Sequence, residues 1–462
     1  MARSKMVFLW LSLFLLPMHA YSATYEVGPG KEYANIGDVP WESMEAGDQV
    51  LIFWRQEPYR EKWVIAVQGT KQRPFVVRGI PNKRGQLPVI DGRDATTRSS
   101  INFWNEERGV VKIGGANQPD IVEPCWIVVK NLDIRNGRPP YRFTGRYGVT
   151  DYQENAASLY VECGRHITVR NCIFHNSGNG LFVSHATRNI LIEGCRIHGN
   201  GIENSVYEHN TYTAAIGITY QFNHFGPLRA NCLGNNLKDR SAGLRVRYNW
   251  IEGGNRQLDL VDAEDSMDLV KHPSYRKTLV YGNVLVETGG SGNSQVVHYG
   301  GDSGNENVYR KGTLHFYNNT VVSTRTDNTT LLRLSTNDEI CDCRNNIVWT
   351  SAPGDHLALL NEAGVVHLKS NWLKSGWVNS HGGLTGTIHN KGGNIRGGRP
   401  GFVNPGLKDY HLLGQSPCVN ASARLHPDAA PVAYQYIKHR KHEPRPVNGA
   451  LDMGAFEVPV EE

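Results

Sequence analysis

Residues 235–265 concentrate opposite charges in a chain of which only 20% of the residues are charged. The stretch reads NNLKDRSAGLRVRYNWIEGGNRQLDLVDAED. Amines, guanidinium groups and carboxylates at close spacing can move protons, neutralise an acidic group or bind a cation. A solvent-exposed surface can carry the same residue types. The surrounding elements must therefore decide between a chemical site and an exposed surface. The basic residues are Lys238, Arg240, Arg245, Arg247 and Arg256, and the acids include Asp259, Asp262, Glu264 and Asp265.

The first 23 residues have the pattern of a secretory signal peptide. Arg3 and Lys5 precede an apolar run over 6–16, and small residues follow up to Ala23. This order of basic, apolar and small residues predicts cleavage after Ser22 or Ala23. The apolar run is too short to span a bilayer and no second run follows, so we expect an exported protein, periplasmic or secreted, without a membrane span.

Composition narrows the function classes. The formal net charge of +5 falls by two when the signal peptide is removed. The remaining positive charge is too small to indicate nucleic-acid binding, but it would suit an acidic polysaccharide. The eight Cys form no CxxC pair and no His lies at zinc-finger spacing, so structural zinc is not expected. A polar chain of about 440 residues with 49 Gly exceeds an ordinary single domain unless its architecture is elongated.

A short segment recurs along the chain and predicts that elongated architecture. Each copy has apolar or basic residues, then Asn, then two to four mostly apolar residues and a polar or Gly break. From Asn171 onward the copies are 23 to 36 residues apart. This pattern favours an all-β chain forming a single right-handed parallel β-helix of about 9–12 coils, with Asn side chains stacked in a ladder. A β-sandwich or propeller is less favoured, because alternation is weak and no blade signature occurs. The repeated slot is occupied by Asn131, Asn171, Gly194, Asn223, Asn249, Asn283, Asn319, Asn346 and Asn371.

The repeat also divides the chain. After the signal peptide we expect an N-terminal cap and first coils over 24–120, a β-helix core over 121–400 and a closing segment over 401–462. Cys172 and Cys195 each follow the repeated slot in consecutive copies, which predicts two buried free thiols one strand spacing apart. The longest turns are expected between about 200 and 310, where most reactive side chains occur.

These longer turns supply candidate site residues beyond the opening stretch. We expect His209 and His298 to be catalytic, with a turn-stabilising role as the alternative for both. His298 lies in SQVVHYGGD, a predicted strand that runs into a Gly turn. The expected substrate-binding residues are Tyr212, His224, Arg245, Arg247 and Asp302, with core packing or solvation as their alternatives.

Two resemblances to known families add to this interpretation. Residues 47–92 and the C-terminal NPGLKDYHLLGQSPCVNASA resemble the opening and closing segments of secreted β-helix enzymes. NNLKDRSAGLRVRYNWIEGG resembles the segment around the catalytic lysine of chondroitinase B and related alginate lyases. The resemblance implies that Lys238 removes the C5 proton of a uronic acid, and that the glycosidic oxygen leaves by β-elimination. Arg240 or Arg256 would neutralise the substrate carboxylate, and His209, Tyr212 or His298 would be the acid or second base. Neighbouring arginines are expected to lower the pKa of Lys238.

The sequence departs from that family where calcium would bind. Residues 231–237 contain no acid, and the second strand reads LDLVD where the family carries Arg. Asp259, Asp262 and Asp265 could instead hold calcium, or serve as catalytic acids of a glycoside hydrolase. Acids three apart on a strand point to opposite faces, which disfavours such pairs. A non-catalytic carbohydrate-binding or surface protein is the third alternative. The expected partner is an anionic polysaccharide, bound by a monomer.

Overall fold

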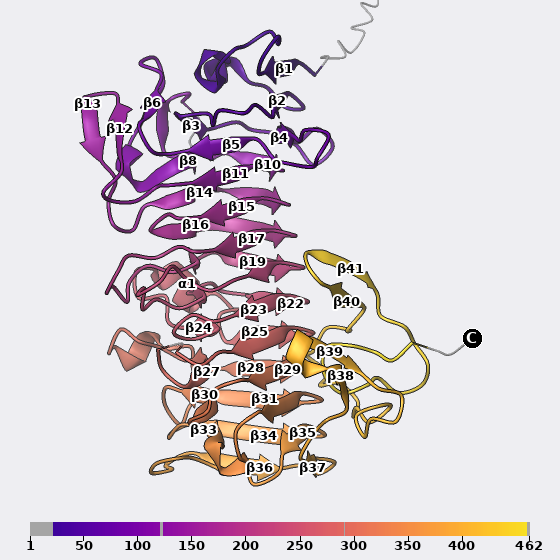
Figure 1. Ribbon diagram of the computed structural model, residues 1–462. Coiled ribbons are helices and arrows are strands. Elements are labelled where there is room, and N and C mark those ends of the chain that lie inside the picture. Colours follow the sequence, from indigo (N-terminus) through magenta and orange to yellow (C-terminus); the bar gives the residue numbers. More distant parts are fainter. Residues whose placement is uncertain (1–21, 121–122, 291, 460–462) are drawn as a thin grey trace, which may run out of the picture.

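The computed structural model describes residues 22–120, 123–290 and 292–459 of the protein. The chain winds into a right-handed parallel β-helix whose coils stack along one long axis (Figure 1). One of its sheets contains 11 strands among the described residues, which agrees with the 9–12 coils predicted from the repeat. The prediction of an all-β parallel β-helix is therefore confirmed.

Each coil contributes strands to three parallel ladders. The first ladder carries the candidate site and lies on the side of the molecule where Figure 1 shows β24, β27, β30 and β33 one below the other. It consists of β3 (Glu61–Ile65), β8 (Gly109–Ile113), the first halves of β14 (Ala157–Arg170) and β16 (Asn179–Glu193), β18 (Thr211–Thr213), β21 (Leu237–Asp239), β24 (Leu258–Leu260), β27 (Gln295–Tyr299), β30 (Thr329–Leu334) and β33 (Leu357–Leu360).

The other two ladders complete each coil. The second ladder consists of β1 (Thr24–Val27), β2 (Gln49–Phe53), β4 (Phe75–Ile80), β10 (Cys125–Lys130), the second halves of β14 and β16, β19 (Ile216–Gln221), β22 (Arg245–Arg247), β25 (Lys277–Tyr281), β28 (Thr313–Tyr317), β31 (Ile340–Arg344), β34 (Val365–Lys369) and β36 (Thr387–Asn390). The third consists of β5 (Val89–Asp91), β11 (Asp133–Arg135), β15 (Ile173–His175), β17 (Arg196–His198), β20 (His224–Phe225), β23 (Trp250–Glu252), β26 (Val284–Glu287), β29 (Thr320–Ser323), β32 (Ile347–Thr350), β35 (Trp372–Lys374) and β37 (Ile395–Gly397).

Shorter elements decorate this frame. Most lie in turns, where the chain leaves one ladder for the next. The strands are β6 (Ala95–Thr97), β7 (Asn102–Phe103), β9 (Ala116–Gln118), β12 (Arg142–Gly145), β13 (Gly148–Asp151), β38 (Phe402–Asn404), β39 (Asp409–Leu412), β40 (Tyr434–Ile437) and β41 (Lys441–Pro444). The helices are α1 (Met267–Lys271) and the 3-10 turns η1 (Ile36–Asp38), η2 (Trp41–Ser43), η3 (Glu106–Arg108), η4 (Glu306–Val308), η5 (Gly354–His356) and η6 (Pro405–Leu407).

The predicted Asn ladder forms at the tight turn between the second and third ladders. Asn283, for example, accepts hydrogen bonds from the backbone N and Nδ2 of Asn249 and donates from its own Nδ2 to Val246 O and Asn319 Oδ1. These buried side chains satisfy backbone groups that the turn leaves unpaired. The ladder runs through Asn223, Asn249, Asn283, Asn319, Asn346 and Asn371, and extends one rung further to Asn394.

The slot assignment was wrong by one residue in the first three copies. Asn131, Asn171 and Gly194 occupy the position before the ladder, where the backbone has φ between 54° and 63°. Asn and Gly both tolerate this left-handed conformation, which explains why they imitate the ladder residue there. Cys172 and Cys195 therefore occupy the ladder slot itself; both are buried free thiols, as predicted.

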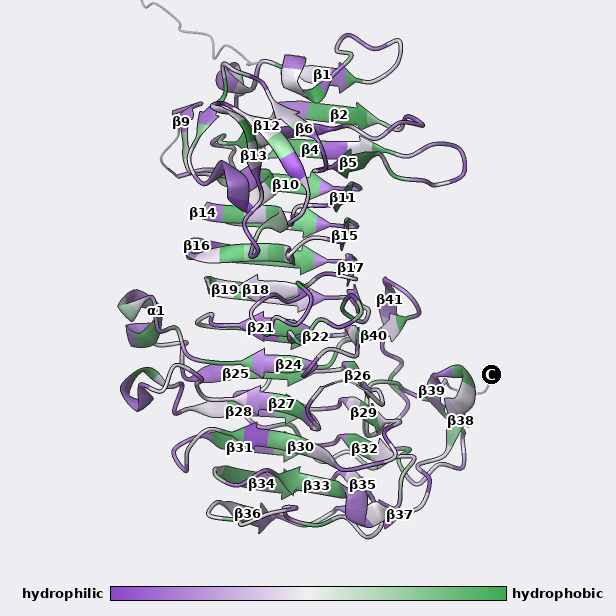
Figure 2. Ribbon diagram, turned by 60° about the vertical axis from the view of Figure 1, so that its left-hand side comes forward, coloured by the Kyte–Doolittle hydropathy of each residue, from purple (hydrophilic) through white to green (hydrophobic). Residues whose placement is uncertain are grey.

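The interior of the solenoid is apolar and the outer turns are polar. Inward-facing Val, Ile and Leu side chains from all three ladders form one continuous core cluster. Figure 2 shows the same division, with hydrophobic colour along strands such as β10, β14 and β16 and hydrophilic colour in the outer loops. The longer turns predicted between 200 and 310 are present at 199–210, 226–236, 261–276 and 300–312. They stand beside the first ladder and supply the walls of the candidate site.

The C-terminal segment runs back along the side of the β-helix. In Figure 1, β38 to β41 stand beside the middle coils, next to the third ladder. The Tyr410 ring stacks on Trp250 at 5.6 Å between centroids, and the Tyr248 hydroxyl accepts from Ala433 N at 2.9 Å. The segment predicted to close the solenoid thus covers a lateral face of it.

The predicted signal peptide covers residues 1–23, of which 1–21 lie outside the described residues, and β1 begins at Thr24. None of the helices in the described part of the chain is long and apolar enough to cross a bilayer.

Candidate active site

Five polar side chains form one outward-facing column on the first ladder. Tyr212, Lys238, Asp259, His298 and Arg333 are direct register partners on successive strands from β18 to β30. The column forms because alternate residues of a strand face opposite sides, and its neighbours on the same strands, including Leu237, Leu258, Val297 and Leu332, face the core. Parallel in-register stacking therefore brings residues far apart in sequence within strand spacing.

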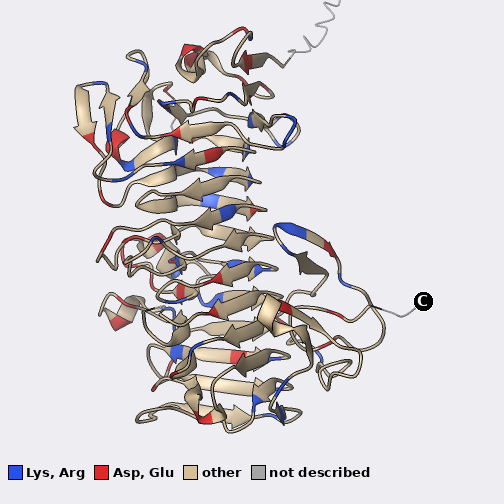
Figure 3. Ribbon diagram, viewed as in Figure 1, with Lys and Arg blue, Asp and Glu red and all other residues tan. Residues whose placement is uncertain are grey.

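This column forms the floor of a cleft of about 850 Å³. The turns at 206–209 and 301–309 contribute to its walls, together with Glu264. Four cationic side chains line the cleft, namely Lys238, Arg240, Arg256 and Arg333, and so do four acids, namely Glu208, Asp259, Glu264 and Asp302. Figure 3 shows blue and red segments interspersed along the ribbon of the middle coils. The cleft itself is lined by both signs of charge, which distinguishes it from a uniformly cationic groove.

Lys238 lies at the centre of the cleft and is paired with two carboxylates. Its Nζ is 3.1 Å from Asp259 Oδ2 and also donates to Asp302 Oδ2. Burial lowers the pKa of Lys238, whose side chain is only 10% exposed, but Asp259 and Asp302 outweigh this effect and raise the pKa above its ordinary value. The expectation that neighbouring arginines lower the pKa was therefore wrong. Arg240 acts in that direction, but the two carboxylates are stronger.

Asp259 is the fixed anion of the cleft. It is 2% exposed and accepts hydrogen bonds from Asn235 Nδ2 at 2.7 Å and from His298 Nδ1 at 2.8 Å. Arg256 Nη1 lies 3.6 Å from its Oδ1. Burial alone would raise the pKa of Asp259, yet Lys238, His298 and Arg256 hold it well below its usual range. The carboxylate is thus ionised and fully occupied by partners.

The two candidate histidines lie in the cleft as neutral rings. Burial lowers the pKa of His209 to about 3, and its Nδ1 accepts the backbone N–H of Asn235 at 2.9 Å. The proton therefore resides on Nε2, which makes His209 a hydrogen-bond donor toward substrate. Burial also lowers the pKa of His298, which donates from Nδ1 to Asp259 and has Ser335 Oγ 3.0 Å from its Nε2. His298 is thereby held as part of the floor.

Arg240 holds Tyr212 in position beside Lys238. Its Nε donates to the phenolic oxygen at 2.9 Å, and Tyr212 stands next to Lys238 in register. The remaining guanidinium nitrogens bind Asp262 O, Glu264 Oε1 at 2.9 Å and Asp302 Oδ1 at 3.1 Å. Burial opposes the charge of Arg240, but Tyr212, Asp302 and Glu264 raise its pKa. Arg240 is thus a positioning group whose donors are all occupied, so a further carboxylate can bind it only by replacing one of these partners.

Arg333 is a functional candidate that the sequence reasoning missed. It is half-buried in the cleft, one strand beyond His298, and within the described residues its guanidinium has no hydrogen-bond or ion-pair partner. Asn235 and Ser335, which orient Asp259 and His298, were also missed. The only sequence signal for Arg333 is its distance of one coil from His298, and the length of that coil is known only from the structure.

Three predicted substrate-binding residues lie outside the cleft. His224 belongs to the third ladder, where its ring stacks on His439 of the C-terminal segment at 3.9 Å. Arg245 and Arg247 belong to β22 of the second ladder. Arg247 donates to Gln221 Oε1 at 2.8 Å and the Tyr281 hydroxyl at 3.1 Å, while Arg245 is exposed. The structure therefore contradicts their assignment to the site. Successive strands of one coil belong to different ladders, and the ladders face different directions, so residues close to Lys238 in sequence lie on other faces of the β-helix.

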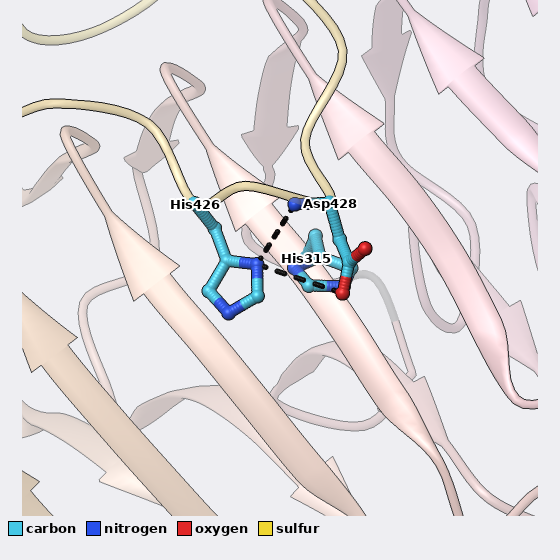
Figure 4. Close-up of side chains that lie close together, drawn as sticks. All are labelled: His315, His426 and Asp428. Atoms are coloured by element: carbon cyan, nitrogen blue, oxygen red, sulfur yellow. Dashed lines mark hydrogen bonds and ion pairs between the residues drawn. The ribbon is translucent and has the colours of Figure 1, made fainter.

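The predicted calcium ligands do not converge. Asp259 is bound by cationic and amide donors, Asp262 accepts from Asp302 N at 2.7 Å, and Asp265 is exposed at the rim. Across 22–120, 123–290 and 292–459, the one group of three or more side chains with closely spaced metal-ligating atoms is His315, His426 and Asp428. Figure 4 shows this group between β28 and the C-terminal segment, on the second ladder and away from the cleft.

No family model matches the chain, and no curated protein matches it. Solved structures do resemble it. A pectate lyase, Pel9A, matches with a TM-score of 0.51 and 12% identity over 95% of this chain and 97% of that chain. An alginate lyase from Paenibacillus sp. matches with a TM-score of 0.48 and 8% identity over 76% and 95%. A lacto-N-biosidase from Eubacterium ramulus matches with a TM-score of 0.39 and 13% identity over 81% and 67%. At these identities the likeness shows the fold alone.

Proposed function

We propose that the protein cleaves a uronic-acid-containing polysaccharide by β-elimination in the 850 Å³ cleft. The observation that carries this proposal is the pair formed by Lys238 and Tyr212. They are register neighbours in an open cleft, and Arg240 donates to the phenolic oxygen. A charged ammonium beside a positioned phenol can supply the acid and the base that elimination requires.

A substrate carboxylate must be neutralised before its C5 proton can leave. Arg240, beside Tyr212, and Lys238 can do this when the substrate carboxylate takes the place of the partly exposed Asp302. Arg333 stands four strands from Tyr212, and its guanidinium, which has no partner within the described residues, is available to the carboxylate of a further uronate of the polymer. Binding the carboxylate to a guanidinium withdraws charge from C5 and favours the carbanion that forms there. An unpaired arginine in an otherwise paired cleft supports an anionic substrate.

In the proposed reaction Tyr212 and Lys238 divide the proton transfers. The Tyr212 oxygen, which accepts a hydrogen bond from Arg240 Nε, takes the C5 proton after its own proton has passed to solvent. The electron pair of the C5–H bond forms the C4–C5 double bond, and the C4–O bond breaks. Lys238, protonated because Asp259 and Asp302 raise its pKa, gives a proton to the departing glycosidic oxygen. The sequence-based role of Lys238 as base is thereby replaced with that of acid.

Glycoside hydrolysis is the second candidate, and one observation favours it. Asp302 Oδ1 and Glu264 Oε1 both bind Arg240 Nη2, at 3.1 and 2.9 Å, so these oxygens are at most about 6 Å apart, an upper limit that excludes the wider carboxyl separations of inverting glycosidases. Despite burial, Lys238 and Arg240 lower the pKa of Asp302, whereas burial raises that of Glu264. Two carboxyls whose pKa values are moved apart in this way have the direction of shift that an acid and its partner carboxylate need.

One assay separates the two reactions. The secreted form is incubated with alginate, pectate, chondroitin and heparin, with and without EDTA, while ultraviolet absorbance of unsaturated uronate and reducing ends are followed together. Elimination raises both signals, and Lys238→Ala and Tyr212→Phe abolish them. Lys271→Ala, an exposed lysine of α1, is the matched control and keeps full activity. Reducing ends without absorbance, lost in Asp302→Asn and Glu264→Gln, would establish hydrolysis instead.

A further inference from the structure

Arg108 is a second arginine whose guanidinium has no polar partner among the residues that the structure describes. Its guanidinium lies over the rings of Tyr160 and Phe182, at 5.1 and 5.0 Å from their centroids. Its Nε is buried and has no hydrogen-bond partner, and within the described residues its side chain forms no ion pair. Stacking on two rings fixes the guanidinium in place, while its hydrogen-bonding capacity stays unused.

Arg108 lines a pocket that continues the catalytic cleft. The pocket has a volume of about 510 Å³ and is lined by Trp104, Tyr160 and Phe182. Tyr212 and Arg240 line both the pocket and the cleft, so the two cavities meet at the proposed proton-transfer pair. Trp104 is 47% exposed, which leaves an aromatic surface open to a sugar ring.

The pocket also continues the column of outward-facing residues. Tyr160, Phe182, Tyr212 and Lys238 are register partners on successive strands from β14 to β21. At roughly 4.8 Å per strand, Tyr160 lies about 14 Å from Lys238 along the helix axis. A polymer that follows the first ladder from Lys238 toward the N-terminal coils therefore enters this pocket.

The charge of the pocket favours an acidic group. Glu162 is already neutralised by Lys112, whose Nζ lies 2.6 Å from its Oε2. Arg240 is saturated by its own partners. Arg108 is thus the cation in the described part of the pocket that can still bind an anion, and the exposed Asp265 at the rim is the charge that opposes it.

We infer that this pocket is a subsite for an acidic sugar of the same polymer, with Arg108 binding its carboxylate and Trp104 contacting its ring. The inference rests on the proposed function. Because Arg333 lies on the opposite side of Lys238, the protein selects polymers whose acidic residues flank the cleaved bond on both sides. Blocks of uronic acid fit this requirement, and chains with isolated uronates do not.

The test measures binding separately from cleavage. Alginate and pectate hexasaccharides are titrated calorimetrically against the inactive Lys238→Ala protein, alone and combined with Arg108→Met, Arg108→Lys or Asp265→Asn. Methionine keeps the apolar contact with the rings and removes the charge. We expect Arg108→Met to weaken binding about tenfold, since it removes a charge-assisted hydrogen-bonding group. Arg108→Lys should restore part of the affinity, and Asp265→Asn should strengthen binding. Arg165→Ala, which removes an exposed arginine paired with Glu123, is the control.

The outcomes separate the two proposals. Weaker binding in Arg108→Met, with thermal stability unchanged and Arg165→Ala unaffected, supports the subsite. Equal affinity in Arg108→Met overturns the subsite and leaves the proposed elimination intact. If neither hexasaccharide binds even the Lys238→Ala protein with Arg108 in place, the uronate substrate and the subsite are both overturned.

Discussion

Asp302→Asn tests the protonation state in which Lys238 acts. Asp302 is one of two carboxylates that raise the pKa of Lys238, and the substitution removes its charge while keeping its shape. An opposite charge at contact distance shifts a pKa by about 1–3 units. The Asp302 side chain is 30% exposed and solvent screens it, so we expect the lower part of that range, about 1–2 units.

The sign of the effect depends on the role of Lys238. A protonated lysine that serves as acid is lost as pH rises through its pKa, so the alkaline limb of kcat/KM should move down by about 1–2 pH units in Asp302→Asn. Each unit corresponds to about 1.4 kcal/mol of lost interaction between the ammonium and the carboxylate. At neutral pH the variant should keep most of its activity, because Lys238 still has Asp259.

Initial rates of unsaturated-uronate formation are measured between pH 7 and 11.5, because the pKa of Lys238 in the unmodified protein is raised above its ordinary value. Glu264→Gln is the matched control, because it removes a carboxylate from Arg240 without touching Lys238. Its alkaline limb should stay in place. An Asp302→Asn enzyme that becomes faster at pH 8–9 would refute the acid role and identify Lys238 as the base. An unchanged limb would show that the proton on Lys238 does not enter the reaction.

Three further predictions follow from the described contacts. Asn283→Ala removes five buried hydrogen bonds and should lower the free energy of unfolding by about 2–4 kcal/mol, measured by denaturant titration, whereas Asn394→Ala at the half-buried last rung should cost far less. Burial lowers the pKa of His209 and His224 to about 3 and that of His198, His315 and His439 to about 4. The unfolded chain, with ordinary histidines, binds more protons, so the melting temperature should fall as pH drops from 6.5 toward 4, and a flat profile would contradict this. EDTA should leave cleavage intact, because Lys238, Arg240 and Arg256 already form ion pairs with acids of the cleft. Activity that is lost in EDTA and restored by calcium would show that cleavage needs the metal.

The fold was predictable because the turn imposes a chemical requirement that recurs in the coils from Asn223 onward. Backbone groups left unpaired beside the third ladder need a short side-chain amide, and Asn283 or Asn319 meets that need. The same turn needs a left-handed residue one position earlier, and Asn meets that need too. One residue type in two adjacent slots explains why Asn131 and Asn171 were placed in the wrong one.

The candidate site was only partly predictable because register depends on turn lengths. Lys238 and Asp259 are 21 residues apart, whereas Asp259 and His298 are 39 apart, yet both pairs are direct neighbours. Residues on the inserted turns could be named as candidates, but the sequence does not state which of them meet. Asp302 reaches Lys238 from two coils further along the chain, and this contact reverses the expected direction of the lysine pKa.

The balance of charge in the cleft also determines how a substrate carboxylate can enter. Asp259 is part of a strand, is 2% exposed and has four partners, so displacing it would leave a buried cation uncompensated. Asp302 belongs to a turn, and its more exposed side chain is the one that an incoming carboxylate can replace at Lys238 and Arg240. A substrate that binds in this way keeps Lys238 protonated without requiring net positive charge in the cleft. Between turnovers the Asp302 carboxylate would keep Lys238 protonated. During each turnover the substrate carboxylate would keep Lys238 protonated in its place.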